Sequence, residues 1–317
     1  MPQKLRAEKR VDKFPSRERA TTVALEPRVS AIVVVRHQRA KPANQGPLDL
    51  CLRSALAEPM IDDLVIVDQD NTPEISAALR ALRADRRDVK VISAPANATV
   101  AAAMNLGARE ARGRWLSFLD PRVVLQRGAA ARMASAGDSA QMPCIVGGRL
   151  TDLEGRERRA AREALNAFSA IALAIDLQAP AAKPKRKRSK RDNEKEQEIA
   201  EPARVAAVSG ALMAIPRRDF QRLNGFDEEF KTDCADLDLC RRAAAAGGSI
   251  LFHPAASGVQ FARSHESGRR QAQGLARFVE RSAKTPVEKA FALIAEPALA
   301  VLLALRDFVV GRPPVRR

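Results

Sequence analysis

The chain is poor in the side chains that stack on nucleic-acid bases. It has no tyrosine and a single tryptophan, Trp115, and aromatic residues make up only 4% of its 317 residues. Proteins that bind single-stranded nucleic acids use such rings as stacking platforms. Only three histidines are present, which argues against a metal site built from several imidazoles. We therefore expect neither a nucleic-acid partner nor a multi-histidine metal centre.

Cysteine is also scarce. The chain has four cysteines, and no two of them stand in a C-x-x-C spacing. A chain of this length can bury a core without disulfide bonds. Its first residues are charged and contain no apolar run of about 7–15 residues, which a secretory signal would have. We expect a cytoplasmic protein with reduced thiols and no secretory signal.

Positive charge is concentrated outside the segments that show a folding pattern. The chain has 54 Lys and Arg against 38 Asp and Glu, a net charge of +16. The excess lies in residues 1–28, in the run 183–191 and after residue 262, so the remaining body is near neutral. A compact nucleic-acid-binding domain would carry a basic face on the fold itself. Binding of RNA or DNA by the run 183–191 stays open as an alternative, but it explains none of the acidic residues below.

Short β-branched runs alternate with helical patterns through residues 29–120. Predicted strands lie at 29–35, 64–68, 89–92 and 115–120, and predicted helices at 48–57, 73–84 and 100–111. This alternation indicates an α/β fold with a central, mostly parallel sheet flanked by helices. Ligands of such sheets bind beyond the carboxyl ends of the strands, where we expect Asp68 and Asp120. A turn or helix-cap role would explain either aspartate alone, but two at strand ends favour a binding site.

The second half of the chain is less regular. We predict strands at 145–148 and at 205–215 around Gly210, a helix at 156–174, and a helix that opens at Asp236. Residues 178–204 combine Ala and Pro with a basic run and an acidic block, a composition that cannot bury apolar surface. The expected organisation is a mobile arm at 1–28, one domain at 29–265 interrupted by a disordered insert at 178–204, and a helical segment at 266–317.

The most apolar segment is Val287 to Val310. Its longest uncharged stretch, Pro297 to Leu305, is nine residues long, whereas a membrane-spanning helix needs about 20 mostly apolar residues. Basic residues flank the segment on both sides, a pattern typical of an amphipathic helix lying on an anionic bilayer. We expect such an interfacial helix, with a helix packed on the core or on a second subunit as the alternative.

Several motifs, taken in order, resemble the family 2 glycosyltransferases with the GT-A fold. The resemblance extends from Val29 to His265, apart from the insert. Its elements are the opening strand 29–35, the strand 64–68 that ends on Asp68, Asn105-Leu106-Gly107, the segment 111–120 that ends on Asp120, Val208 to Met213, Asn224 to Phe230, and Asp236 to Arg242. The resemblance implies a GT-A-like (Rossmann-like) domain that binds a nucleotide-diphosphate sugar.

The resemblance also implies roles for individual residues. It assigns nucleotide-sugar binding to Asp68, Asn105 and Asp120, to which we add Arg36 and Arg122, where the sequence departs from the family pattern. The acceptor side has Asp227, Glu228 and Asp238, and the general base is Asp236. The implied reaction is inverting transfer of a sugar to a hydroxyl of a lipid-linked or cell-surface glycan. The implied place of action is the inner face of the cell membrane, in cell-surface polysaccharide biosynthesis.

The sequence departs from the family pattern where a metal ion would bind. The family's DxD motif, which typically holds Mg²⁺ or Mn²⁺, reads Asp120-Pro121-Arg122, so Asp120 is the one metal ligand that remains there. A metal-ligating His of the family is replaced by Gln260, and His265, five residues on, is the candidate substitute. The Glu before Asp236 is replaced by Ala235. Two interpretations follow. Either Arg122, with Arg36, neutralises the diphosphate without a metal, or the fold is a catalytically inactive scaffold or binding subunit of a polysaccharide assembly system.

Overall fold

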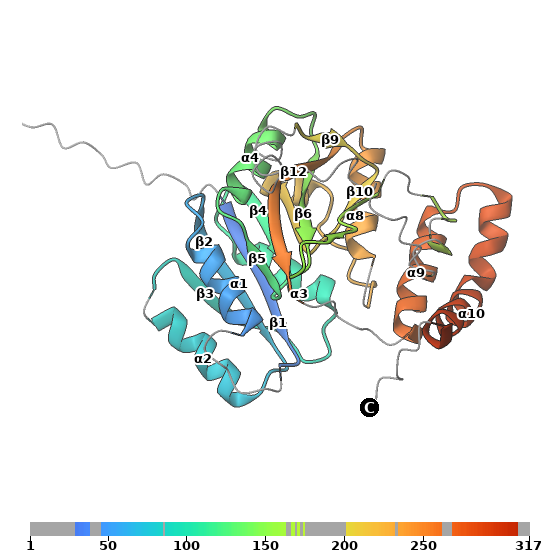
Figure 1. Cartoon of the computed structure of the whole chain (residues 1–317). Coiled ribbons are helices and arrows are strands. Elements are labelled where there is room, and N and C mark those ends of the chain that lie inside the picture. Colours follow the sequence, from blue (N-terminus) through green and yellow to red (C-terminus); the bar gives the residue numbers. More distant parts are fainter. Residues whose placement is uncertain are drawn as a thin grey trace, which may run out of the picture.

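The computed structural model describes most of the chain between residues 29 and 309 (Figure 1). The described residues are 29–38, 46–84, 86–162, 166–168, 170–171, 174, 201–231, 234–261 and 268–309. The expected N-terminal arm, the basic run 183–191 and His265 lie outside them.

The first part of the chain alternates strands and helices as expected. It comprises β1 (Val29–Arg36), α1 (Pro47–Leu56), β2 (Ile61–Gln69), α2 (Pro73–Ala84), β3 (Val89–Ser93), α3 (Val100–Glu110), β4 (Trp115–Leu119), β5 (Val123–Leu125) and α4 (Ala129–Asp138). Local signals account for the helix starts. Pro73 opens α2, where its missing N–H costs nothing, and the hydroxyl of Thr99 caps α3 by accepting from the N–H of Ala102 at 3.0 Å.

The second part contributes shorter strands and the C-terminal helices. It comprises β6 (Cys144–Thr151), β7 (Glu157–Arg158), β8 (Ala161–Arg162), β9 (Ala203–Arg204), β10 (Ala207–Val208), β11 (Leu212–Pro216), α7 (Arg217–Arg222), α8 (Ala235–Ala245), β12 (Ser249–Gln260), α9 (Gly268–Ser282) and α10 (Pro286–Val309).

One large mixed sheet organises these elements. Its strand order is β3-β2-β1-β4-β11-β6-β12-β5, with β7 added to β6 and β9 to β12. The strands β3, β2, β1 and β4 are parallel, β11 is antiparallel to both of its neighbours, and β6 and β12 are parallel to each other. This arrangement confirms the predicted α/β architecture.

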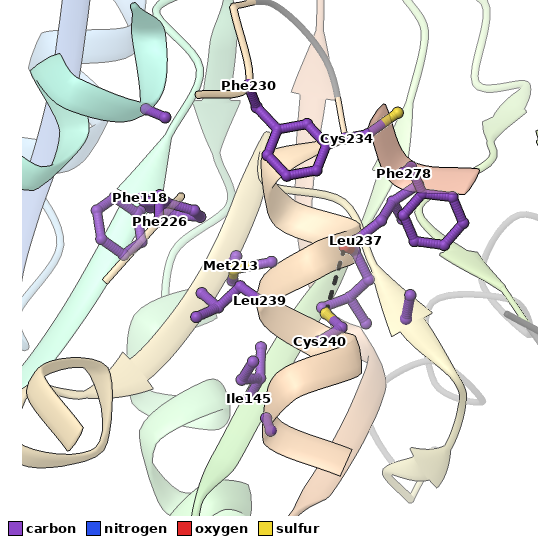
Figure 2. Packing of buried hydrophobic residues seen from close by; sticks show 14 of the residues in the cluster. Phe118, Ile145, Met213, Phe226, Phe230, Cys234, Leu237, Leu239, Cys240 and Phe278 are labelled. Atoms are coloured by element: carbon purple, nitrogen blue, oxygen red, sulfur yellow. Dashed lines mark hydrogen bonds between the residues drawn. The ribbon is translucent and has the colours of Figure 1, made fainter. Parts of the chain in front are cut away.

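Apolar side chains of the sheet point alternately to its two faces, because successive residues of a strand do so. In β1, Val33 and Val35 join the core cluster that contains α1 and α4, while Ile32 joins the cluster on the other face. That second cluster includes α8, whose Leu239 packs toward Met213 (Figure 2). Helices therefore cover both faces of the sheet and leave the ends of its strands for a site.

Three local predictions were wrong. The expected helix at 156–174 is replaced over 157–162 by β7 and β8, because those residues pair with β6 and β10. The expected strand at 205–215 is interrupted by a turn at 209–211 between β10 and β11. The last two residues of the expected insert, 203–204, form β9 on the edge of β12. In each case tertiary pairing, which no local pattern encodes, decided the outcome.

The helices α9 and α10 pack against each other and contact the core beside α8 (Figure 1). A capping box starts α10: the N–H of Glu288 donates to the Thr285 hydroxyl at 3.2 Å, and the N–H of Thr285 donates to the Glu288 carboxylate at 2.9 Å. Within the described residues, no helix combines the length and apolar character needed to cross a membrane.

Candidate functional site

The two strand-end aspartates lie at the same edge of the sheet, as predicted. Asp68 is paired with Val35 of β1, and Leu119, which precedes Asp120, is paired with Val33 of the same strand. Because β2, β1 and β4 are parallel neighbours, their carboxyl ends meet at one edge. The two carboxylates thus flank the end of β1, where a ligand of such a sheet binds.

Asp68 is buried and oriented by Asn71. The Nδ2 of Asn71 donates to Oδ1 of Asp68 at 2.6 Å and to the carbonyl of Val35 at 2.7 Å, and its Oδ1 accepts from the N–H of Gln38 at 2.9 Å. One oxygen of Asp68 is therefore fixed from within the protein. Sequence reasoning missed Asn71, although its position three residues after Asp68 was a usable signal.

Arg36, at the end of β1, belongs to a polar cluster with His37 and Asp70. Its Nη2 lies 2.8 Å from Nε2 of His37, and Nδ1 of the same imidazole lies 2.8 Å from Oδ2 of Asp70. Since a guanidinium only donates, Nε2 accepts and Nδ1 carries the proton. Both His37 (φ 54°) and Asp70 (φ 49°) adopt left-handed backbone conformations, a strained state that is concentrated at functional sites.

Arg122 is locked onto Asp120. Its Nε and Nη2 donate to the two carboxylate oxygens at 2.8 and 2.5 Å, and its backbone N–H donates to Oδ1 at 2.9 Å. Both side chains are largely buried, with 25% of Arg122 and 17% of Asp120 exposed. The oxygens of Asp120 that would face a cation are thus engaged by a cation of the chain itself.

These residues do not fit a divalent metal ion. Among the described residues, no group of three or more His, Cys, Asp or Glu side chains is close enough to hold one, and Asp120 is bound at both oxygens by Arg122. Hard divalent cations need several oxygen ligands. Arg122 occupies the place where the second carboxylate of the motif would stand.

Asp236 lies in the first turn of α8 and contacts the turn between β10 and β11. Its Oδ2 accepts from the backbone N–H of Gly210 at 2.7 Å, and its Oδ1 accepts from the N–H of Leu237 at 2.9 Å. The next residue of the turn, Ala211, accepts through its carbonyl from the N–H of Asp120 at 3.0 Å. The turn therefore connects the carboxylate of Asp236 to the backbone of Asp120.

Asn105 and Glu228 hold a loop rather than face open space. Asn105 is buried, and its amide pairs with both backbone groups of Phe226, at 2.9 Å to the N–H and 2.8 Å to the carbonyl. The same Nδ2 donates to Oε1 of Glu228 at 2.9 Å. Gly225 allows this approach: its φ is +67°, and a Cβ there would lie 2.6 Å from Oδ1 of Asn105. The geometry indicates that Asn105 positions the loop.

Asp238 is buried and paired with two arginines of its own helix. Its oxygens accept from Arg241 at 2.7 Å and from Arg242 at 2.6 Å. Arg242 also donates to the carbonyls of Leu223 and Gly225. The spacings i, i+3 and i+4 place these three side chains on one helix face, so the pairing could have been read from the sequence.

A cavity of about 430 Å³ lies between α3, the 223–228 loop, α8 and α9. Its lining includes Asn105, Asp227, Glu228, Asp238, Arg241 and Arg281. The cavity thus brings the predicted acceptor-side residues together. Asp68, Asp120 and Asp236 are not among its lining residues, although Asp236 stands in the same first turn of α8 as Asp238.

A sequence model of the family described as "Glycosyl transferase family 2" matches residues 31–218, which is more than half of the chain. The chain belongs to this family. The match contains Asp68, Asp120 and Arg122 and ends before Asp236. This family 2 chain is therefore a glycosyltransferase, as the motifs predicted.

A curated relative of this family 2 chain is the rhamnosyltransferase WbbL of Escherichia coli (strain K12). The two are 37% identical over 54 residues, which is 17% of this chain and 20% of WbbL. The match therefore spans a fifth of the relative's length.

Solved structures share the fold at low sequence identity. GalNAc-T7, solved with UDP, GalNAc and Mn²⁺, gives a TM-score of 0.60 at 17% identity, covering 89% of this chain and 55% of its own. The mannosyltransferase PcManGT of Pyrobaculum calidifontis, in complex with GDP-Man and Mn²⁺, gives a TM-score of 0.52 at 17% sequence identity. The match covers 92% of this chain and 77% of PcManGT. At such identities the likeness shows the GT-A fold alone.

Proposed function

We propose that this chain transfers a sugar from a nucleotide-diphosphate sugar to an acceptor hydroxyl, with inversion at the anomeric carbon and without a metal ion. The observation that carries the proposal is the turn at 209–211. Its backbone binds Asp236 through Gly210 and Asp120 through Ala211, so a candidate base and a candidate phosphate-binding pair flank one short segment.

Arg122 supplies positive charge at the diphosphate in this proposal. A guanidinium binds phosphate oxygens by bidentate, charge-assisted hydrogen bonds. The pairing with Asp120 uses Nε and Nη2, so Nη1 stands outside it and Asp120 holds the guanidinium in place. Arg36, at the end of the neighbouring β1, adds a second cation at the same edge. Together they stabilise the negative charge that develops on the departing nucleoside diphosphate.

Asp236 acts as the general base. Its carboxylate takes the proton of the acceptor hydroxyl while the hydroxyl oxygen attacks the anomeric carbon from the face opposite the diphosphate. The bond from that carbon to the diphosphate oxygen breaks, and the bonding pair leaves with the nucleoside diphosphate. The N–H groups of Gly210 and Leu237 donate to the two oxygens of this carboxylate and fix its direction.

The nucleoside is assigned to Asp68 and the acceptor to the loop with Asp227 and Glu228. Carboxylate oxygens accept hydrogen bonds from ribose hydroxyls or base N–H groups, and Asn71 orients one oxygen of Asp68 for this contact.

The acceptor is a lipid-linked or cell-surface glycan, in cell-surface polysaccharide biosynthesis at the anionic inner face of the membrane. The basic C-terminal residues support the membrane assignment, and the name of WbbL, a rhamnosyltransferase, supports the transfer of a sugar.

Calorimetric titration of UDP, GDP and dTDP, each with and without Mn²⁺, tests the donor site. We expect one nucleotide to bind independently of Mn²⁺, with the affinity lost in Arg122→Ala and kept in Arg127→Ala, an exposed arginine five residues on. Asp236→Asn should keep this binding and lose turnover by about 10²–10⁴-fold. Absence of binding for all three nucleotides in the folded protein would favour the non-catalytic scaffold instead.

A further inference from the structure

The outward face of α10 is a continuous apolar surface. On its inner side, Ala295, Leu299 and Leu303 are buried in the core cluster shared with α9. On its outer side, Leu293 and Phe308 are each 86% exposed. The helix is therefore apolar on both faces, which also shows that the expected division into one apolar and one polar face does not describe it.

A helical projection makes the outer face explicit. At about 100° per residue, the exposed apolar residues fall within an arc of about 140°: Val287, Ala290, Leu293, Ile294, Pro297, Ala298, Val301, Ala304, Leu305 and Phe308. The exposed charged residues Lys289 and Glu296 lie outside this arc. A helix in contact with water on its outer side carries polar residues there, and a contiguous exposed apolar patch marks an interaction surface.

The length and composition of α10 indicate how it meets a partner. Its 24 residues extend over about 36 Å at 1.5 Å per residue. Glu296 and Lys289 interrupt its apolar character, and the helix does not qualify as a membrane span. A helix of this kind lies along a surface rather than crossing it.

Charge distinguishes a lipid surface from a second copy of the chain. Lys284 and Lys289 flank the start of α10, and Arg312, Arg316 and Arg317 follow its end in the sequence. Two copies paired through this face would bring cations against cations in either orientation, since both ends of the helix are basic. An anionic bilayer attracts both ends at once.

We propose that the exposed face of α10 docks lengthwise on an anionic bilayer, with its apolar side chains at the boundary between headgroups and acyl chains. This inference rests on the proposed function, because it assigns the membrane contact of the proposed transferase to one surface. Ion pairs join α9, which packs against α10, to the acceptor side: Arg281 of α9 binds Asp227 at 3.0 Å, and Arg277 binds Glu229. The helix α9 thereby connects the acceptor loop to α10.

Vesicle sedimentation of the full chain tests the proposal. We expect the protein to pellet with vesicles of 70% phosphatidylcholine and 30% phosphatidylglycerol, and to pellet at least tenfold less with pure phosphatidylcholine. The double variant Leu293→Asp/Ile294→Asp should lose at least tenfold in partition. The matched control is Leu153→Asp, since Leu153 is 60% exposed in the turn after β6; it should sediment as wild type does. Equal partition of wild type and double variant would overturn the proposal.

Two further measurements separate this proposal from others. Light scattering after gel filtration measures the oligomeric state and so tests the alternative that a second copy covers α10. Lipid docking would be overturned if wild type is a dimer that does not bind vesicles and the double variant is a monomer. Calorimetric nucleotide binding by the double variant should equal that of wild type. If no nucleotide binds but vesicle binding and its loss in the variant hold, the proposed reaction fails and the docking surface stands.

Discussion

The backbone N–H of Gly210 donates to Oδ2 of Asp236 at 2.7 Å and fixes the direction of the proposed base. A Cβ at position 210 would lie 3.1 Å from the Cβ of Asp236. This distance is shorter than an ordinary van der Waals contact, so the two backbones approach this closely because residue 210 is glycine. The position of the proposed base therefore depends on a residue that carries no functional group.

We predict that Gly210→Ala lowers kcat by about tenfold or more and leaves the affinity for nucleotide nearly unchanged. The added methyl group moves the carboxylate of Asp236 by a few tenths of an ångström, and small misplacements of a catalytic group cost up to about 10²-fold. Steady-state kinetics with the nucleotide sugar found by calorimetry measures the effect. Gly155→Ala serves as the control: a Cβ there would meet nothing within 4 Å, and its φ of +76° makes the substitution strained only in a turn away from the proposed base, so the variant should keep the wild-type kcat. An unchanged kcat in Gly210→Ala would contradict the prediction.

We predict that Arg122→Asp makes nucleotide binding depend on Mn²⁺. The substitution removes the cation that engages both oxygens of Asp120 and places a second carboxylate two residues on, so that oxygen ligands replace the guanidinium. Calorimetry with and without Mn²⁺ compares this variant with Arg127→Asp, which should bind as wild type does. Metal-independent binding at wild-type affinity in Arg122→Asp would show that Arg122 does not contact the diphosphate.

We predict that Asn105→Ala destabilises the fold by about 2 kcal/mol, because it leaves the N–H and carbonyl of Phe226 without their partner in a buried site. Urea unfolding followed by circular dichroism measures the change. Asn97→Ala, in an exposed turn, should change the free energy of unfolding by less than about 0.5 kcal/mol. If the two variants proved equally stable, the loop would not depend on Asn105.

We predict that His253 makes the protein less stable at acidic pH. Burial lowers the pKa of this β12 imidazole below its ordinary value of 6.5; the positive charge of Arg132 adds to the shift, and Glu201 opposes it. The unfolded chain therefore binds a proton at a higher pH than the folded chain does. The stabilisation is present above about pH 6.5 and is lost as the pH falls through the lowered pKa of the folded state.

Urea unfolding of wild type and His253→Gln at pH 7.5 and 5.5 tests this dependence. The loss of stability on acidification should be smaller in the variant, since glutamine does not titrate. Identical losses in the two proteins would assign the acid sensitivity to other groups.

The sequence by itself determined the α/β architecture and the elements that build its parallel half. The helix α2 begins and ends where its pattern predicts, because Pro73 and the apolar spacing act locally. The strand β1 is recognisable because burial on both faces demands a β-branched run. The predicted parallel direction of these strands placed Asp68 and Asp120 at one edge of the sheet, since parallel strands bring their carboxyl ends together.

Only the tertiary structure decided what the side chains at that edge contact. The sequence shows that an arginine replaces the second acid of the motif, but not that Arg122 binds both oxygens of Asp120. It did not reveal that the amide of Asn105 is engaged by a loop 121 residues away, or that the 209–211 turn links Asp236 to Asp120. Local patterns report backbone preference and burial, whereas hydrogen-bond partners distant in sequence are set by how the elements pack, which is why these contacts required the folded chain.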